Sequence, residues 1–318
     1  MRPGVGRLSG NEGNLRERAF TRGTARSVAD IGTSVHWWTS QGQAVLPIVF
    51  MVVFGLVPLL MLFVWSFWER DGYWIAPAFT LENYRDIVAT GRTETIVRTV
   101  RIAAVTTVLA AFLAFPASYF FARVAGPRAK SVLLFAFTIP FIVSPLIRVF
   151  ALRFLLGAKG ALNQGLLALG VVDQPVAWFL FSDFAVYVGM LVSYLSFCIF
   201  PIWLAMERID SSLFEASTDL GASPWQTLRI VVIPLALPGI FAGCLFVFVS
   251  VLGEMAVSLI LGGAGMVLLG NMLLNVIDTV QYTLAAAISA AVLATMVLML
   301  IVGQVLFRIS DLFEPLRR

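Results

Sequence analysis

The sequence has few of the residues from which catalytic and metal sites are built. Its 318 residues include one histidine and two cysteines, and only 13% of them are charged. The single histidine, His36, lies in the N-terminal tail, so no Ser/His/Asp set is evident. The chain also has no CxxC pair and no G-x-x-x-x-G-K-[ST] phosphate loop. We therefore expect a protein that is not an enzyme, that holds no metal and no cofactor, and that cannot bind ATP through a P-loop of its own.

Positive charge is also sparse, and it is not arranged as a nucleic-acid-binding surface. The net charge is +4, and the basic residues flank apolar segments rather than forming a patch interleaved with aromatic residues. Nucleic acid is therefore excluded as a partner. Residues 1–43, rich in Gly, Ser, Thr and Arg, predict a flexible basic tail that either touches anionic membrane lipid or is simply solvated.

Hydrophobic residues are abundant, at 59% of the chain, which is too many for a soluble core of this size. They form six segments near the roughly 20 residues needed to cross the hydrocarbon of a bilayer. The segments are about 44–67, 99–121, 131–156, 184–205, 236–261 and 284–307. The sequence thus predicts an all-α, polytopic transmembrane bundle of six spans within residues 44–318, kinked where prolines fall inside spans.

The distribution of Lys and Arg predicts the orientation of these spans. With the N-terminus in the cytoplasm, fourteen of the 22 basic residues fall on the inner side, five fall on the outer side and three lie within spans. Positive residues collect on the cytoplasmic side of membrane proteins. We expect both termini in the cytoplasm, together with the loop between the fourth and fifth spans.

That loop, Met206 to Pro238, is the long polar insert of the second half of the chain. Ser212 and Glu215 have the spacing of a capping box, which predicts a first short helix with Glu215 in its first turn. Gly221 follows where a left-handed residue ends a helix most easily, so we expect it to adopt a positive φ.

A second short helix is predicted directly after this corner. Ser223 is the expected N-cap, with Pro224 at the first helical position and Gln226 completing a capping box. The helix should run to about Val232, and two prolines, Pro234 and Pro238, should end it.

The two predicted helices are amphipathic. Leu213, Phe214 and Leu220 share an apolar face of the first helix that has no evident partner in the sequence. Two interpretations remain open at this point: a preformed docking surface for a soluble partner, or a pair of helices lying on the bilayer surface.

A motif in this loop resembles a known family. Glu215-Ala216-Ser217 is followed after three residues by Gly221 and after nine more by the segment 231–234, which reads VVIP. The pattern is similar to the EAA loop of binding-protein-dependent ABC importer permeases, written as EAA, three residues, G, nine residues, I-x-L-P. Ser217, Val231 and Ile233 depart from it conservatively, so we expect the contact to survive with slightly altered packing.

The flanking sequence extends the resemblance to spermidine/putrescine permeases over about residues 83–307. The segments that carry it are 138–141, 144–148, 155–163 and 237–244. In that family the EAA loop is a coupling helix that sits in a cleft of the ATPase subunit. The resemblance implies that the coupling residues here are Leu213, Phe214, Glu215, Ala216, Ser217, Leu220, Gly221, Ile233 and Pro234.

Ionisable residues inside the predicted spans are the other candidates for function, because such residues usually face a cavity or a partner. There are four: Arg101, Arg148, Arg153 and Glu254. One interpretation is structural, with Arg148 and Glu254 forming a pair. The other places Glu254, Arg148 and Arg101 on the translocation path or its outer gate, where Glu254 would attract a cationic solute or the arginines an anionic one.

Together these patterns predict an inner-membrane permease subunit of an ATP-driven ABC importer, with a polyamine as the expected solute. The resemblance implies ATPase subunits that bind the ATP, a second homologous permease subunit and a periplasmic solute-binding protein. The alternatives are an ATP-independent secondary transporter or channel, or an importer permease for another small solute such as an amino-acid derivative or an anion. No inverted repeat of the kind common in secondary carriers is evident.

Overall fold

The computed structural model describes residues 45–72 and 74–311, so the predicted tail, residues 1–43, lies outside the described residues. The chain divides into two compact units between Leu62 and Phe63. The described part of the first unit is helical. It belongs to the helix Val45–Trp65, which contains a π-helical turn, η1 (Val52–Leu56), and α2 (Val57–Trp65). This helix lies at the position of the first predicted span.

The second unit begins with a small antiparallel hairpin and continues as helices. Strands β1 (Glu69–Asp71) and β2 (Trp74–Ala76) pair with Glu69 opposite Ala76. The helices are α3 (Glu82–Ala89), α4 (Arg92–Tyr119), α5 (Pro127–Ile142), α6 (Pro145–Leu156), α7 (Ala161–Ala168), α8 (Asp183–Glu207), α9 (Ser211–Asp219), α10 (Pro224–Thr227), α11 (Ile233–Leu252), α12 (Leu269–Asp278) and α13 (Tyr282–Asp311). Shorter turns are η2 (Phe120–Val124), η3 (Ala177–Phe179), η4 (Leu228–Val232) and η5 (Ser258–Gly262). The all-α prediction is confirmed, with the hairpin as an unpredicted addition.

Five described helices are long and apolar enough to cross a membrane, and a sixth span is present if one bent pair of helices is counted as one. The bent pair corrects the third predicted span, 131–156, which is not one straight helix. The chain breaks after Ile142 and turns by 100° into the segment that starts at Pro145. Pro145 has no N–H to continue a helix, and it forces the preceding Ser144 into an extended conformation, with ψ of 132°.

The fifth predicted span, 236–261, is also corrected. Its helix begins earlier, because α10, the π turn η4 and α11 form one continuous helix, Pro224–Leu252. Pro234 and Pro238 therefore do not end the second loop helix. The Ile233 N–H bonds to the Leu228 carbonyl in the wide π turn, and such a turn accommodates a missing main-chain donor nearby. At the other end the helix stops at Leu252, before Gly253.

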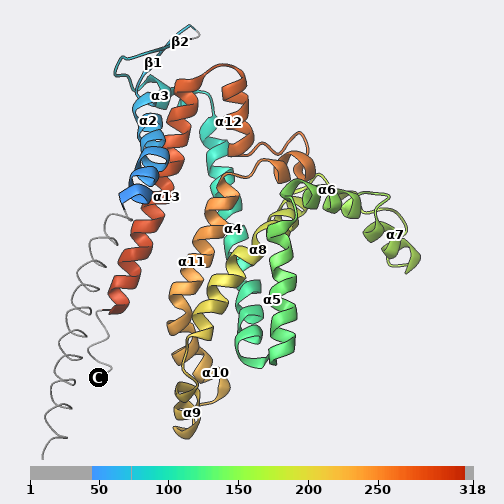
Figure 1. The fold of residues 1–318 in the computed structure, drawn as a ribbon. Coiled ribbons are helices and arrows are strands. Elements are labelled where there is room, and N and C mark those ends of the chain that lie inside the picture. The colour runs from blue at the N-terminus through green and yellow to red at the C-terminus, as the bar shows by residue number, and fades with distance from the viewer. Residues whose placement is uncertain (1–44, 73, 312–318) are drawn as a thin grey trace, which may run out of the picture. The chain divides into compact units, whose positions relative to one another are not determined.

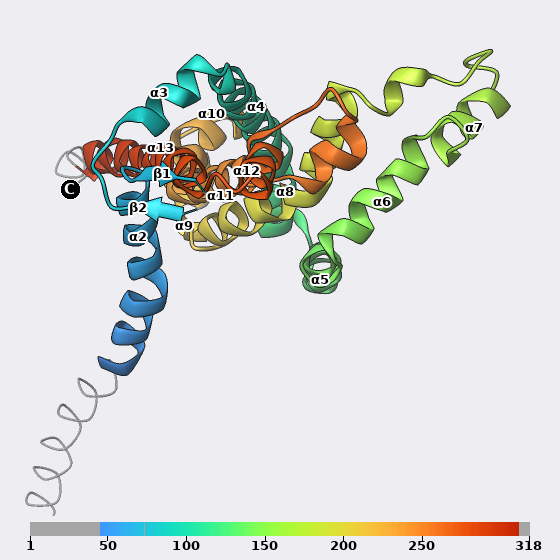
Figure 2. The same ribbon diagram turned by 90° about the horizontal axis from the view of Figure 1, so that it is seen from above.

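Three helices, α4, α8 and α11, pack against one another and form the main core of the second unit. Ile102, Met190, Ile202 and Val247 are among their fully buried side chains. A smaller core joins α3, α12 and α13. Figure 2 shows α6 and α7 running out from the α4, α8 and α11 group. Many large apolar side chains of α5 and α6 are exposed, as expected for helices that meet lipid or another chain.

The contact between α8 and α11 depends on a close approach at Gly239. A Cβ atom on this residue would lie 2.5 Å from the Pro201 carbonyl oxygen and 2.5 Å from the Ala205 Cβ. Small residues at helix interfaces permit such approaches, which are the main source of attraction between helices inside a bilayer. Gly239 therefore sets the separation of the two central helices.

Gly239→Ala is expected to lower the melting temperature of the purified protein, because the added methyl group would push α11 away from α8. Overpacking of this kind destabilises by about 1–3 kcal/mol. Gly165→Ala in α7 is the control, since a Cβ there meets nothing within 4 Å. The control should melt at or slightly above the wild-type temperature. Equal melting temperatures for wild type and Gly239→Ala would contradict the close packing.

Candidate functional site

The polar insert between α8 and α11 forms a compact two-helix loop. Helix α9 covers residues 211–219, and α10 starts five residues later and runs straight into α11. Figure 1 shows both short helices beyond the ends of α8 and α11, at the opposite end of the second unit from α12. We call residues 206–238 the coupling loop.

The start of α9 differs from the prediction. Asp210, not Ser212, is the N-cap, and its Oδ1 accepts a hydrogen bond from the Ser212 N–H at 2.9 Å. The hydrogen bonds from Ser212 hold the pKa of the Asp210 carboxyl below its ordinary value. The helix thus begins at Ser211, and Glu215 lies in its second turn, exposed and outside the capping box assigned to it. Asp210 directly precedes the helix and is a strongly preferred N-cap residue, so it takes the capping position predicted for Ser212.

The corner after α9 is formed as predicted. Gly221 has a φ of +77°. Its N–H bonds to the Thr218 carbonyl at 2.9 Å, and the Ala222 N–H bonds to the Ser217 carbonyl at 3.0 Å. This pair of hydrogen bonds is the Schellman motif, which satisfies the last carbonyls of a helix through one left-handed residue.

Helix α10 also starts as predicted. The Ser223 side chain accepts from the Gln226 N–H, while the Ser223 N–H donates to the Gln226 Oε1 at 2.7 Å. A contact that the sequence did not reveal joins the two helices, since the Ser217 and Thr227 hydroxyl oxygens lie 2.7 Å apart in a hydrogen bond. Ser217 is a departure from the family motif, and here it fastens α9 to α10.

The exposed apolar surface of the loop contains two of the three residues predicted for it. Leu213, Leu220 and Trp225 are exposed, with Leu220 at 88% of its full accessibility. Phe214 was expected beside them without a partner, but it packs against the main core. The sequence pattern defines the apolar face of α9, but it does not show which side of the helix meets the bundle.

The remaining motif residues are spread over both faces of the loop. Glu215 and Ala216 are exposed on α9, whereas Ile233 and Pro234 are half-buried at the start of α11. The structure thus brings Glu215, Ala216 and Leu220 to the free side of the loop, and places Ile233 and Pro234 where the loop enters the bundle.

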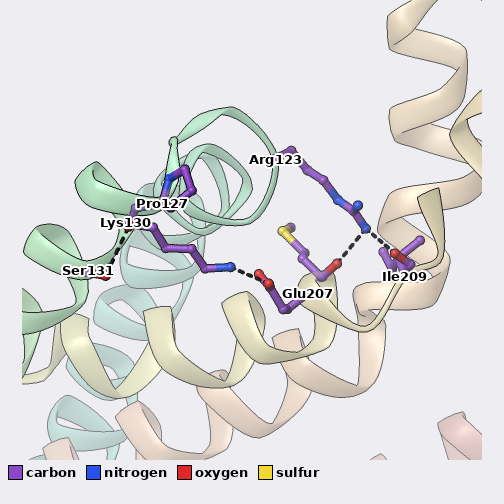
Figure 3. Close-up of polar contacts among 7 residues, drawn as sticks. Arg123, Pro127, Lys130, Ser131, Glu207 and Ile209 are labelled. Carbon is purple, nitrogen blue, oxygen red and sulfur yellow. Dashed lines mark hydrogen bonds and ion pairs between the residues drawn. The ribbon is translucent and has the colours of Figure 1, made fainter.

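Two basic residues that the sequence analysis did not single out hold the base of this loop. The Arg123 Nη2 donates to the Met206 carbonyl at 2.9 Å and to the Ile209 carbonyl, and Lys130 pairs with Glu207 (Figure 3). Arg123 lies in η2, which follows α4, and Lys130 lies in the first turn of α5. The sequence showed that both lie among basic residues on the predicted cytoplasmic side. It did not show their partners, which are main-chain and side-chain groups about 80 residues away.

Glu254, one of the predicted path residues, lies near the far end of α11. It is only 9% exposed, its Oε1 accepts from the Ala256 and Val257 N–H groups at 2.7 and 3.0 Å, and its Oε2 accepts from the Tyr194 hydroxyl. The carboxylate therefore caps the helical segment that restarts after Gly253. Both oxygens therefore already accept hydrogen bonds from the protein.

Arg148 does not pair with Glu254, which corrects the predicted ion pair. Its Nη1 donates to the Ser193 carbonyl at 3.0 Å and to the Val192 carbonyl at 3.5 Å, and its Nη2 donates to the Val143 carbonyl at 3.1 Å and to the Pro140 carbonyl. The guanidinium thus satisfies carbonyls at the break between α5 and α6 and ties them to α8. Main-chain acceptors freed by the break offer it more partners than one carboxylate could.

The other two arginines of the predicted spans make no hydrogen bond or ion pair with Glu254 or Arg148. Arg101 is exposed on α4 and makes no hydrogen bond or ion pair with the described residues. The Arg153 guanidinium lies 5.5 Å from the Phe181 ring centroid. Near Phe181, a cavity of about 450 Å³ is lined by Arg98, Asp183 and the glycine-rich turn 262–266.

Comparison with known proteins gives consistent matches. Residues 96–318 match the family model of the binding-protein-dependent transport system inner membrane component. The chain is 36% identical over 257 residues to the spermidine/putrescine transport system permease protein PotB of Escherichia coli (strain K12), covering 79% of this chain and 92% of that protein. The PotB protein of Haemophilus influenzae (strain ATCC 51907 / DSM 11121 / KW20 / Rd) is 33% identical over 224 residues, covering 70% and 78%.

Solved structures show the same fold at low sequence identity. A crystal structure of a bacterial ABC transporter involved in alginate import aligns with a TM-score of 0.62 at 15% identity, covering 85% of this chain and 95% of that chain. The same kind of transporter in complex with a periplasmic protein bound to an alginate pentasaccharide gives a TM-score of 0.65 at 14% identity, covering 84% and 92%.

Glu254→Gln is expected to lower the melting temperature, because an amide oxygen is a weaker acceptor than a carboxylate for the two N–H groups and the Tyr194 hydroxyl. Hydrogen bonds to a charged group contribute about 1.5–3 kcal/mol. Glu69→Gln in the exposed strand β1 is the control and should change little. Since Arg148 binds carbonyls, adding Arg148→Gln should lower stability further. Recovery of stability in the double variant would instead demonstrate an Arg148–Glu254 pair.

Proposed function

We propose that this chain, which belongs to the family of binding-protein-dependent transport system inner membrane components, is the permease subunit of an ATP-driven importer for polyamines. The observation that carries the solute assignment is the 36% identity to a spermidine/putrescine permease along 92% of that protein's length. Transport follows alternating access in a multi-pass inner-membrane protein, and the chain itself is not an enzyme. ATP is bound and hydrolysed by a partner subunit.

The coupling loop is the proposed contact with the ATPase. The loop exposes an apolar surface formed by Leu213, Leu220 and Trp225, and Glu215 adds an acidic group to it. Both of its short helices are capped at their N-termini. A rigid loop can transmit a movement of its partner, because a flexible loop would change conformation instead of moving as a unit. The alternative interpretation, helices lying on the bilayer, gives no reason for the Schellman corner and the Ser217–Thr227 bond.

The proposed assembly has two further parts and a defined orientation. A second permease subunit covers the exposed apolar helices, and a periplasmic solute-binding protein delivers the solute to the end opposite the coupling loop. The termini and the coupling loop lie in the cytoplasm, where ATP is available and where the Lys and Arg residues are concentrated.

The charged residues of the predicted spans do not select the solute in this proposal. Glu254 and Arg148 use their charged atoms on main-chain groups and Tyr194. Arg101, by contrast, is exposed on α4 and makes no hydrogen bond or ion pair with the described residues, but its positive charge would not attract a polyamine. Selection between solutes is therefore assigned to the binding protein and to groups on the assembled path.

Uptake by the reconstituted complex tests the function. Proteoliposomes that contain both permease subunits, the ATPase subunits and the loaded binding protein should accumulate radiolabelled spermidine or putrescine only when ATP is supplied, and vanadate should stop the uptake. Uptake that continues without ATP would support the secondary transporter or channel instead. ATP-dependent uptake of an amino-acid derivative or an anion, without polyamine uptake, would retain the importer and replace its solute.

Gly221→Val should uncouple the complex, because a β-branched residue at φ of +77° is strained. Such strain costs about 1–3 kcal/mol, enough to open the corner between α9 and α10. Stimulation of ATP hydrolysis by the loaded binding protein should fall, while the protein inserts in normal amounts. Gly221→Asn is the control, since asparagine tolerates the left-handed conformation and a Cβ there meets nothing within 4 Å. Full stimulation in the valine variant would contradict the docking assignment.

A further inference from the structure

Arg123 occupies the junction between the bundle and the coupling loop. It lies in the π turn η2, which extends α4 at the loop end of the second unit, and its side chain is half-buried. One nitrogen, Nη2, donates to the Met206 carbonyl at 2.9 Å and to the Ile209 carbonyl at 2.5 Å (Figure 3). These carbonyls belong to the last turn of α8 and to the link that follows it. Arg123 therefore joins the end of α4 to the end of α8.

The same guanidinium also contacts the coupling loop itself. Its Cζ lies 4.3 Å from the centroid of the Phe214 ring, within the range of a cation–π interaction. Phe214 is on α9, and its ring packs against the main core. Among the ring contacts and hydrogen bonds of the described residues, this is the one that joins α9 to α4.

The three segments that meet at Arg123 are those that a coupling movement must link. Helix α9 carries the exposed residues Glu215 and Leu220 on its free side and Phe214 on its bundle side. Helices α4 and α8 pack on each other and on α11 in the main core. A displacement of α9 on its buried side therefore acts on the guanidinium through Phe214. The guanidinium extends from the turn that continues α4, and it is hydrogen-bonded to the end of α8 and to the link that follows it.

We propose that Arg123 is the positioning residue through which movement of the coupling loop is transmitted to α4 and α8. The proposal rests on the proposed function of the chain as a permease driven by a partner ATPase. Arg123 touches neither the solute nor the exposed surface of the loop. It acts through Phe214 on one side and the Met206 and Ile209 carbonyls on the other.

The test compares variants in the reconstituted complex, with spermidine imported per ATP hydrolysed as the measured ratio. Arg123→Gln should lower this ratio by about fivefold or more, the lower end of the coupling typical between two sites. ATP hydrolysis without binding protein should persist. Arg123→Lys keeps a cation that can sit over Phe214 and donate to a carbonyl, so it should recover part of the ratio. Arg128→Gln is the matched control: it removes an arginine from the first turn of α5, where the side chain is exposed and makes no hydrogen bond or ion pair with the described residues.

The outcomes separate this inference from the proposed function. A wild-type complex without ATP-dependent uptake would overturn the function. A coupled wild type with an unchanged ratio in Arg123→Gln would overturn the inference alone. A structural role would lower the amount of assembled complex at an unchanged ratio, which also contradicts it. If Arg123→Gln does not assemble, Phe214→Leu keeps the apolar packing and removes the ring: a reduced ratio in that variant supports the transmission, and a wild-type ratio overturns it.

Discussion

Every interruption of a helix in an apolar environment leaves main-chain donors or acceptors that need new partners, and the charged side chains of this protein supply them. Arg148 covers the Pro140 and Val143 carbonyls where α5 breaks from α6. Glu254 covers the Ala256 and Val257 N–H groups after α11 stops. Both side chains also reach α8, through the Ser193 carbonyl and the Tyr194 hydroxyl. Since water is absent from the bilayer core, an unsatisfied group there costs several kcal/mol, and the breaks depend on these two residues.

This use of charge changes how ionisable residues in the spans should be interpreted. A charged residue in an apolar span is by default a candidate for the transport path. In Arg148 and Glu254 the charge instead holds the irregular backbone in place and links it to a central helix. Arg148 holds the carbonyls at a bend of 100° between two helices. Their contribution is then geometric, and it does not reveal the sign of the charge on the solute.

The sequence predicted those features that are encoded within a few residues. Gly221, Ser223 and Gln226 adopt the expected corner and capping box because a helix end is determined by its own turn. The apolar runs predicted helices, but the third and fifth predicted spans needed correction. The break at Ser144 was also local, since a residue before proline avoids the helical region, but the prolines were treated as kinks within a continuous span.

Features that depend on residues far apart in the sequence could not be predicted. An arginine in a span can donate hydrogen bonds either to a carboxylate or to main-chain carbonyls freed at a helix break. Only the fold shows which of these acceptors is near. For Arg148 the carbonyls were nearer, and the expected pair with Glu254 does not form. Phe214 was expected on the free side of α9 because the helix pattern gives a face but not its direction. Arg123 and Lys130 contact the end of α8 across about 80 residues, and no periodic pattern marks such a contact.

The coupling loop is firm internally and attached to the bundle at few places, and this contrast determines how it can act. Hydrogen bonds at Asp210, Gly221, Ser223 and between Ser217 and Thr227 fix α9 relative to α10. The loop continues into α11 without a break, so α10 and α11 must move together. Helix α9 has no such continuity with α8, because a short link separates them, and its connection passes through the side chains of Phe214 and Arg123. A displacement of the loop is therefore delivered to α11 through the main chain. At the other end of the loop, the link 208–210 joins α9 to α8, and the Arg123 guanidinium joins α9 to the extension of α4 and to the end of α8. The guanidinium is the part of this second route that a single substitution can remove.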